Sequence, residues 1–172
     1  MSDPMVIREL AAGDPIEQLT ELLHRAFAPL GMRGMNYTAV DQSSLETARR
    51  ISTGLCAVAT LDGIIVGTVM AESGPDPASE SAWYRRLDVA SAHQLGVEPS
   101  HQRRGIGSAL MRWAESWAVR SGYAEIAVDT AEPATELISF YTRLGYRQIE
   151  YAQWHGKRYR SVILSKPLKS AT

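Results

Sequence analysis

The chain has 172 residues, of which 45% are hydrophobic and 22% are charged, and its formal net charge is −1 at pH 7. This near-neutral balance argues against a protein that binds nucleic acid or an anionic membrane through bulk charge. No apolar run reaches the length of a membrane span, and the chain length suits a single domain, residues 1–172, with a core of its own.

The cysteine and histidine content bounds the chemistry further. Cys56 is the single cysteine, so no internal disulfide can form, which favours a reducing compartment. The four histidines have no metal-ligand spacing, and we expect no metal cofactor. Met1-Ser2-Asp3-Pro4 lacks the basic and then apolar pattern of a signal peptide. We therefore expect a cytoplasmic protein.

The N-terminal part of the chain predicts one strand and two helices. Met5–Leu10 has the composition of a strand, and Asp14-Pro15 predicts the N-cap and first turn of a helix. Apolar residues then recur at helical spacing, namely Ile16, Leu19, Leu22, Leu23, Ala26 and Phe27. A second helix is predicted over residues 41–51, opened by Asp41 or Ser43.

A hairpin and an insertion follow. The apolar runs Leu55–Leu61 and Ile64–Ala71 flank Asp62-Gly63, a turn dipeptide that favours a hairpin. Gly67 in the second run indicates a bulge. Residues 72–90 begin with a stretch rich in serine, proline and glycine, which predicts a surface loop between two strands.

The strongest functional signal lies in a predicted strand, a basic loop and a helix over residues 92–97, 98–104 and 105–120. The loop and the helix start carry Arg103, Arg104, Gly105 and Gly107. The first N–H groups of a helix have no intrahelical partner and attract anions. Glycines let the backbone approach a ligand, and arginines supply forked donors to phosphate oxygens. We therefore predict a pyrophosphate cradle.

Two other phosphate motifs fit this loop less well. A Walker loop requires a lysine after its last glycine, and here Ser108 and Ala109 follow Gly107. A dinucleotide fingerprint requires a third glycine where the chain has Leu110. The remaining alternative is a helix N-terminus with exposed arginines and no ligand.

The C-terminal part predicts a mixed α/β domain. A short strand over 125–129 precedes a helix from Pro133 to Leu144. Strands over 146–151 and 159–165 then form a closing antiparallel pair, joined through a turn that contains Trp154. The long helix before them buries a stripe that includes Trp113 and Trp117, which we expect in the core. The sum is one domain with a largely antiparallel sheet.

Three segments together carry a family resemblance. Gln102-x-x-Gly105-x-Gly107, preceded by Leu95-Gly96-Val97-x-Pro99, resembles the acetyl-CoA signature of the Gcn5-related N-acetyltransferase (GNAT) superfamily. Phe140-Tyr141-x-x-Leu144-Gly145-Tyr146 resembles its second signature. The resemblance covers about residues 5–168. It implies the acyl-CoA N-acyltransferase fold, a mixed sheet flanked by about four helices, with acetyl-CoA as cosubstrate and a possible homodimer.

The resemblance also implies roles for residues. The donor site would comprise Leu95, Gly96, Val97, Gln102, Arg103, Arg104, Gly105, Ile106, Gly107, Ser108, Thr135 and Tyr141. Tyr141 matches the family's catalytic tyrosine, which protonates the leaving thiolate. His93 is the candidate general base, with Asp88, Glu72 and Glu98 or a water relay as alternatives. On the strand before Pro99, side-chain alternation predicts that His93 shares a face with Leu95 and Val97.

One position departs from the family pattern. Many relatives carry an asparagine near the start of the 133–144 helix, where it contacts the pantetheine arm. This chain has Thr130-Ala131-Glu132-Pro133-Ala134-Thr135 there. Thr135 or Thr130 is the expected replacement, unless the contact is missing.

The leading function is acetyl-CoA-dependent acetylation of the primary amine of a small molecule, by direct attack in a ternary complex. The alternatives are a non-catalytic acyl-CoA sensor and an enzyme that acetylates a protein or peptide amine. Candidate acceptor-binding residues are Trp83, Tyr84, Asp88 and Trp154, and the 72–90 insertion is a candidate lid. Ring faces would suit a cationic or apolar amine, whereas an acidic acceptor would use Arg85, Arg86 or Arg158.

Overall fold

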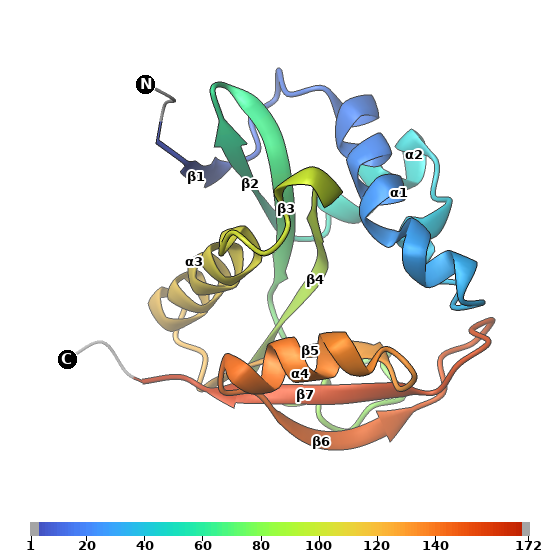
Figure 1. The fold of residues 1–172 in the computed structure, drawn as a ribbon. Helices are drawn as coiled ribbons and strands as arrows, with labels where there is room; N and C mark the ends of the chain where they lie inside the picture. The colour runs from blue at the N-terminus through green and yellow to red at the C-terminus, as the bar shows by residue number, and fades with distance from the viewer. Residues whose placement is uncertain (1–3, 170–172) are drawn as a thin grey trace.

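A computed structural model describes residues 4–169 and has one seven-stranded sheet in the order β1-β2-β3-β4-β5-β7-β6 (Figure 1). The strands are β1 (Val6–Glu9), β2 (Leu55–Leu61), β3 (Ile64–Glu72), β4 (Val89–Val97), β5 (Glu125–Ala131), β6 (Arg147–Ala152) and β7 (Ser161–Pro167). All neighbouring pairs are antiparallel except β4 and β5, which are parallel. The predicted mixed and largely antiparallel sheet is confirmed. Residues 1–3 and 170–172 of the expected domain lie outside the described residues.

Four α-helices cover the two faces of the sheet. They are α1 (Ile16–Met32), α2 (Ser44–Ile51), α3 (Ile106–Arg120) and α4 (Thr135–Arg143), with short 3₁₀ turns at Thr38–Val40 and Pro99–His101. Leu19 of α1 packs on one face with Cys56, Val58 and Met70. On the other face α3 contributes to the largest buried cluster, to which α4 adds Tyr141. Figure 1 shows α1 and α2 on the opposite side of β2–β4 from α3. No helix within residues 4–169 has both the length and the apolar character that crossing a membrane requires.

The predicted hairpin of β2 and β3 is present, and Gly67 in its second strand has a packing role. β3 has a register shift opposite Ala59 and Thr60, which leaves Val66 as the extra residue beside Gly67. A Cβ at Gly67 would lie 3.0 Å from Leu110 Cδ1 and 3.2 Å from Ile106 Cγ2. The glycine therefore lets α3 lie close to the sheet.

This close packing corrects the expectation for Trp113 and Trp117. Both indoles are half-buried at the edge of the largest cluster rather than inside it. The fully buried residues of α3 are Leu110, Met111, Ala114 and Ala118. Small alanines take the positions nearest to the sheet, so the bulky rings flank that line.

The starts of two helices differ from expectation, and the cap of a third is one of the two that the sequence predicted. The N-cap of α1 is Pro15, without a side-chain cap, rather than Asp14. The cap of α2 is Ser43, which accepts from the Glu46 N–H at 3.1 Å, so of the two alternatives Ser43 is correct. α4 begins two residues after Pro133, at Thr135.

Asp14 instead joins the end of β1 to the turn before α1. Its carboxylate accepts two hydrogen bonds from Arg8, at 2.7 and 2.9 Å, and one from the Ala11 N–H at 2.7 Å. The Arg8 hydrogen bonds are the main reason why the pKa of Asp14 falls to about 2.

This pKa predicts a stability difference that depends on pH. Asp14→Asn should lower the free energy of unfolding at pH 7 by at most about 1 kcal/mol, because Arg8 is partly exposed. A carboxyl with a depressed folded-state pKa stabilises above its unfolded value of about 3.9. The difference should therefore shrink as the pH falls from about 4 towards 2. Urea denaturation at several pH values tests this, with exposed Glu9→Gln as the control. An equal loss at pH 3 and pH 7 would contradict an ionic origin.

Candidate active site

The site is created where the two parallel strands separate. β4 pairs with β5 over only three residues, Val89↔Glu125, Ala90↔Ile126 and Ser91↔Ala127. Beyond Ser91, β4 stays paired with β3 up to Val97, so its edge towards β5 keeps free backbone groups. A cavity of about 870 Å³ lies there, lined by residues of β4, β5, α1, α3 and α4.

A bulge in β4 changes which side chains share a face. Gln94 has φ +51°, and the register with β3 shifts between Thr68 and Met70. Two residues of β4, Gln94 and Leu95, therefore oppose one residue of β3. The expectation that His93 shares a face with Leu95 and Val97 is wrong, because the bulge reverses the alternation between them.

As a result, Leu95 and Val97 lie on the face of β4 that α3 covers, and His93 lies on the face that α1 covers. Leu95 and Val97 pack with the α3 cluster. A Cβ at Gly96 would meet Leu23 of α1 at 3.1 Å, so position 96 faces the other helix layer. His93 faces that layer as well, near Glu72 and Asp129.

The predicted cradle has the geometry of an anion site. Gly105 is the N-cap of α3 with φ +79°, and no side chain caps the helix. Arg103 also has a left-handed φ of +62°, which turns successive N–H groups towards one concave side. Ala109 N–H makes the first helical bond, to Gly105 O at 3.0 Å. The N–H groups of Ile106, Gly107 and Ser108 are therefore free of intrahelical partners, and these three residues line the cavity.

Gln102 fastens this loop to the strand before it. Its side-chain amide donates to Val97 O at 3.1 Å, and both residues line the cavity. Arg103 lines the cavity too, whereas Arg104 is exposed outside the lining. Neither guanidinium forms an ion pair within residues 4–169.

Tyr141 lines the same cavity. Its ring is 8% exposed and packs edge-on against Phe140 and Tyr146, with centroids 5.1 and 5.6 Å away. The hydroxyl has no hydrogen-bond partner within the described part of the chain. Burial raises the pKa of Tyr141, so the phenol stays protonated at neutral pH.

His93 lies in a group of polar side chains at the β4–β5 divergence. Its Nε2 is 2.9 Å from Ser91 Oγ and 3.6 Å from Glu72 Oε2, and its Nδ1 is 3.9 Å from Asp129 Oδ1. Asp129 also accepts hydrogen bonds from the Tyr84 hydroxyl at 2.8 Å and from Trp154 Nε1 at 3.0 Å. Two carboxylates thus face one imidazole, an arrangement suited to proton transfer.

The candidate acceptor residues separate into two groups. Trp154 lines the large cavity, and Tyr84 lines an adjoining cavity of about 600 Å³ whose wall includes residues 72–80 of the insertion. Trp83 lines neither; its ring stacks under the Arg86 guanidinium at 4.2 Å. Asp88 lies away from both cavities and forms an ion pair with Arg86 at 2.7 Å.

Two further predictions concern the threonine that contacts the pantetheine arm of the donor and the arginines that would bind an acidic acceptor. Thr130 lines the cavity with its hydroxyl 2.8 Å from that of Tyr37, whereas Thr135 is exposed outside the lining. The structure therefore brings Thr130, and not Thr135, to the site. The expected cations Arg85, Arg86 and Arg158 line neither cavity.

Sequence reasoning missed three cations that line the large cavity, namely Arg50, Lys157 and, in the last turn of α4, Arg143. Arg50 lies in the last turn of α2, three residues after the fully buried Thr47. That spacing puts Arg50 and Thr47 on the same face of α2, and this was the sequence signal that could have placed Arg50 towards the interior. Lys157 is in the β6–β7 connection, and only the fold brings it to the site. Within residues 4–169, no group of three or more His, Cys, Asp or Glu side chains could hold a metal ion.

A sheet that opens between its parallel strands, with an anion cradle beside the opening and a phenol facing it, defines an acyl-CoA-dependent transferase. A sequence model of the Acetyltransferase (GNAT) family matches residues 16–146, and the chain belongs to this family. It is an N-acetyltransferase with acetyl-CoA as the acetyl donor.

Individual relatives agree with this assignment. The chain is 27% identical over 168 residues to S-(2-succino)cysteine N-acetyltransferase of Bacillus subtilis, covering 93% of this chain and 94% of that protein. A GNAT family acetyltransferase from Elizabethkingia anophelis with acetyl-CoA bound has a TM-score of 0.70 at 18% identity, with 96% and 99% coverage. The ribosomal-protein-S18-alanine N-acetyltransferase from Escherichia coli has a TM-score of 0.73 at 18% identity, with 98% and 97% coverage. At these identities the two structures support the fold alone.

Proposed function

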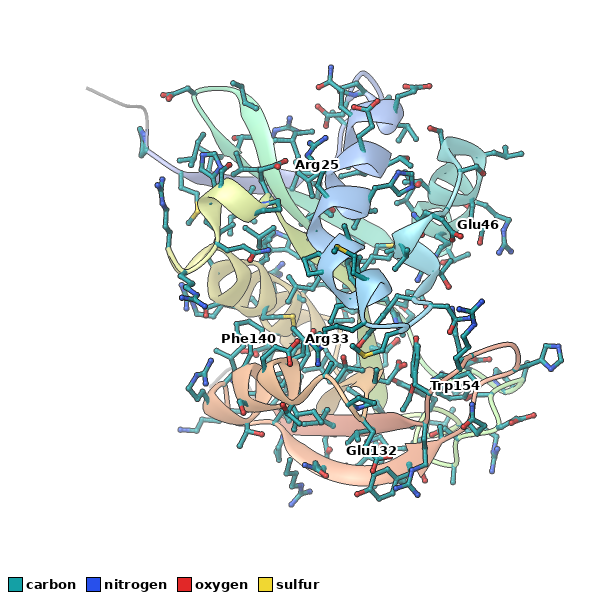
Figure 2. The ribbon with its side chains drawn as sticks, turned by 45° about the vertical axis from the view of Figure 1, so that its right-hand side comes forward. Arg25, Arg33, Glu46, Glu132, Phe140 and Trp154 are labelled. Carbon is teal, nitrogen blue, oxygen red and sulfur yellow. The ribbon has the colours of Figure 1, made fainter. Side chains whose placement is uncertain are left out.

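We propose that the protein acetylates the primary amine of a small molecule by direct attack on acetyl-CoA in a ternary complex. The observation that carries this proposal is the continuity of one cavity, which joins the anion cradle at Gly105–Ser108 to His93, Asp129 and Tyr141. In Figure 2, Phe140 on α4 and Trp154 on the β6–β7 connection lie on opposite sides of the view, and both line this cavity.

The residues of the donor half fit acetyl-CoA. The N–H groups at the start of α3 and the Arg103 guanidinium would hold the pyrophosphate. The free edge of β4 from Leu95 to Val97 would pair with the amide groups of the pantetheine arm, as an added strand does. Bound acetyl-CoA supplies the activated thioester, and a backbone N–H of Leu95 or Val97 would polarise its carbonyl.

Proton transfer is assigned to two side chains. An alkylammonium group has a pKa near ~10 and must lose a proton before its nitrogen can attack. His93 would accept this proton, held by Ser91 and flanked by Glu72 and Asp129. Tyr141 would donate a proton to the departing thiolate, since its buried phenol is protonated and has no internal partner.

A covered rim favours a small acceptor over a protein. Asn36 ties the α1–α2 loop to the β6–β7 connection by donating to Gly156 O at 2.9 Å and accepting from the Arg158 N–H at 2.9 Å. Arg33, directly after α1, forms an ion pair with Glu136 of α4 and donates to Pro133 O at 3.0 Å. Together with the 72–80 segment, which lines the adjoining cavity, these contacts support a small acceptor rather than a polypeptide.

Release of free thiol from acetyl-CoA tests the proposal. The panel should include polyamines, aminoglycosides, arylalkylamines, amino acids, short peptides and S-(2-succino)cysteine. We expect one class of small amines to raise thiol release well above the background hydrolysis. If only peptides were acetylated, the acceptor would be a protein or peptide amine and not a small molecule. A flat panel with intact acetyl-CoA binding would contradict small-amine acetylation.

A further inference from the structure

Two cations from distant parts of the sequence meet at the acceptor end of the cavity. Arg50 comes from α2 and Lys157 from the β6–β7 connection, and both are half-buried. Neutral oxygens hold them in place. Arg50 Nη1 donates to Gln42 Oε1 at 2.7 Å, and Lys157 Nζ donates to Asn36 O at 2.8 Å and to Thr38 Oγ1 at 3.0 Å. Neither side chain is a mobile surface group.

The position of Arg50 is fixed relative to the β4 bulge. Gln42 Nε2 donates to Gln94 Oε1 at 2.9 Å, and Gln42 and Gln94 are 5% and 8% exposed. A buried amide chain therefore connects the guanidinium to the residue next to His93. This connection puts Arg50 beside the proton-transfer group, whereas the anion cradle lies beyond Val97 at the other end of this stretch of β4.

Neither cation has a directly contacting carboxylate within the described residues, although Glu46, Glu72 and Asp129 act on Arg50, and Asp41 and Asp129 on Lys157, from a longer distance. No carboxylate in residues 4–169 lies within 4.0 Å of either Arg50 or Lys157. The exposed Arg49 beside Arg50, by contrast, is paired with Glu46 at 2.6 Å. Burial lowers the pKa of both the Arg50 guanidinium and the Lys157 ammonium. Holding two unpaired cations in a partly buried cavity is costly unless an anion completes the site.

We propose that the acceptor amine also carries a carboxylate, and that Arg50 and Lys157 bind this carboxylate while the amine lies at His93 and Asp129. The proposal rests on the proposed function, whose acceptor it narrows to amino-acid-like amines. Arg50 retains guanidinium donors not used by Gln42, and a guanidinium is suited to two-point binding of a carboxylate. Both residues determine specificity and take no part in the chemical step.

Matched acceptor pairs test the carboxylate directly. The probes are L-methionine, L-glutamate and S-carboxymethyl-L-cysteine, each compared with its α-amide. We expect the parent protein to favour at least one acid over its amide by about 100-fold in kcat/KM. Arg50→Met and Lys157→Met should each remove most of this preference, mainly through KM for the acid, with the affinity for acetyl-CoA unchanged. Arg50→Lys should retain part of it.

Neighbouring residues supply matched controls. Arg49→Met and Arg158→Met change exposed side chains next to each cation that line neither cavity, and they should keep the preference for the acid. Thermal unfolding followed by circular dichroism shows whether each variant is folded, independently of acetyl-CoA binding. If Arg50→Met weakened acetyl-CoA binding as much as acid binding, the cations would serve the donor and the proposal would be wrong.

Two outcomes separate this inference from the proposed function. Equal turnover of acids and amides would leave the acetyltransferase reaction standing and overturn the carboxylate site. If no amine were acetylated, calorimetric binding of the acids to the CoA-loaded protein would decide the inference alone. Acid binding lost in Arg50→Met would support it, and equal binding of acid and amide would reject it.

Discussion

Replacing Gly107 by glutamate is expected to abolish acetyl-CoA binding. A Cβ at this position would lie 3.4 Å from Phe140 Cζ and 3.8 Å from Val97 Cγ2, so the rest of the side chain must extend into the cradle. Its carboxylate would occupy the free N–H groups at the start of α3 and repel the pyrophosphate. Like charges brought together in a binding site cost several kcal/mol, which corresponds to a loss of about 100-fold or more in affinity. Calorimetry with acetyl-CoA and with CoA measures the loss.

Three variants separate charge, bulk and folding in this experiment. Gly107→Ala adds only an ordinary van der Waals contact and should bind acetyl-CoA almost normally. Gly107→Gln adds the bulk without the charge and should fall between the two. Gly13→Glu adds the same charge at an exposed glycine with open space around it and should leave the affinity for acetyl-CoA unchanged. Glutamate near a helix N-terminus favours the helix, so the free energy of unfolding of Gly107→Glu should not decrease. Undiminished affinity in Gly107→Glu would show that the cradle does not bind the donor.

The sequence predicted the elements of the fold because their signals are local. Asp62-Gly63 between two apolar runs specified the hairpin, and the spacing from Ile106 to Ala118 specified the long helix. Ser43 was one of two caps that the sequence offered, and the structure uses it. Asp14 was misassigned because its carboxylate binds Arg8 across a turn, a contact that no local rule distinguishes from a helix cap.

The site was predictable in its donor half and less so in its acceptor half. The cradle is a continuous stretch, so Gly105 and Gly107 could be read directly from the sequence. The bulge at Gln94 could not, because a glutamine in a left-handed conformation carries no sequence signature, and it moved His93 to the face opposite Leu95. Arg50 and Lys157 meet only after α2 and the β6–β7 connection pack around the cavity. Long-range packing therefore determines which acceptor groups are present.

The two halves also differ in how the protein balances charge. At the donor end, Arg103 is free of internal carboxylates and faces an anion cradle. At the acceptor end, Asp129 accepts hydrogen bonds from Tyr84 and Trp154, while the hydrogen-bond partner of Arg50 within residues 4–169 is the neutral Gln42. Between them, the hydroxyl of Tyr141 is a neutral donor with no acceptor among residues 4–169. Within the described residues, a cation without a directly contacting carboxylate therefore lies at each end, and a proton donor without an internal acceptor lies between them.

That unpartnered hydroxyl leads to the second large expected effect. Tyr141→Phe should lower kcat by about 100-fold or more, the usual contribution of a positioned general acid, while the affinity for acetyl-CoA stays near the parent value. The ring keeps its contacts with Phe140 and Tyr146, and only the proton donor is lost. Steady-state thiol release with the best acceptor, together with calorimetric acetyl-CoA binding, measures the two quantities separately.

Tyr146→Phe is the matched control for this experiment, because it removes a hydroxyl five residues away that donates to Glu115 at 3.1 Å and does not line the cavity. It should reduce the free energy of unfolding by about 1 kcal/mol and leave kcat unchanged. Tyr141→Phe should show the opposite pattern, because its hydroxyl has no internal hydrogen bond to lose. A parent-like kcat in Tyr141→Phe would exclude the phenol as the general acid. The thiolate would then take its proton from water, with the rate retained through the donor-binding groups alone.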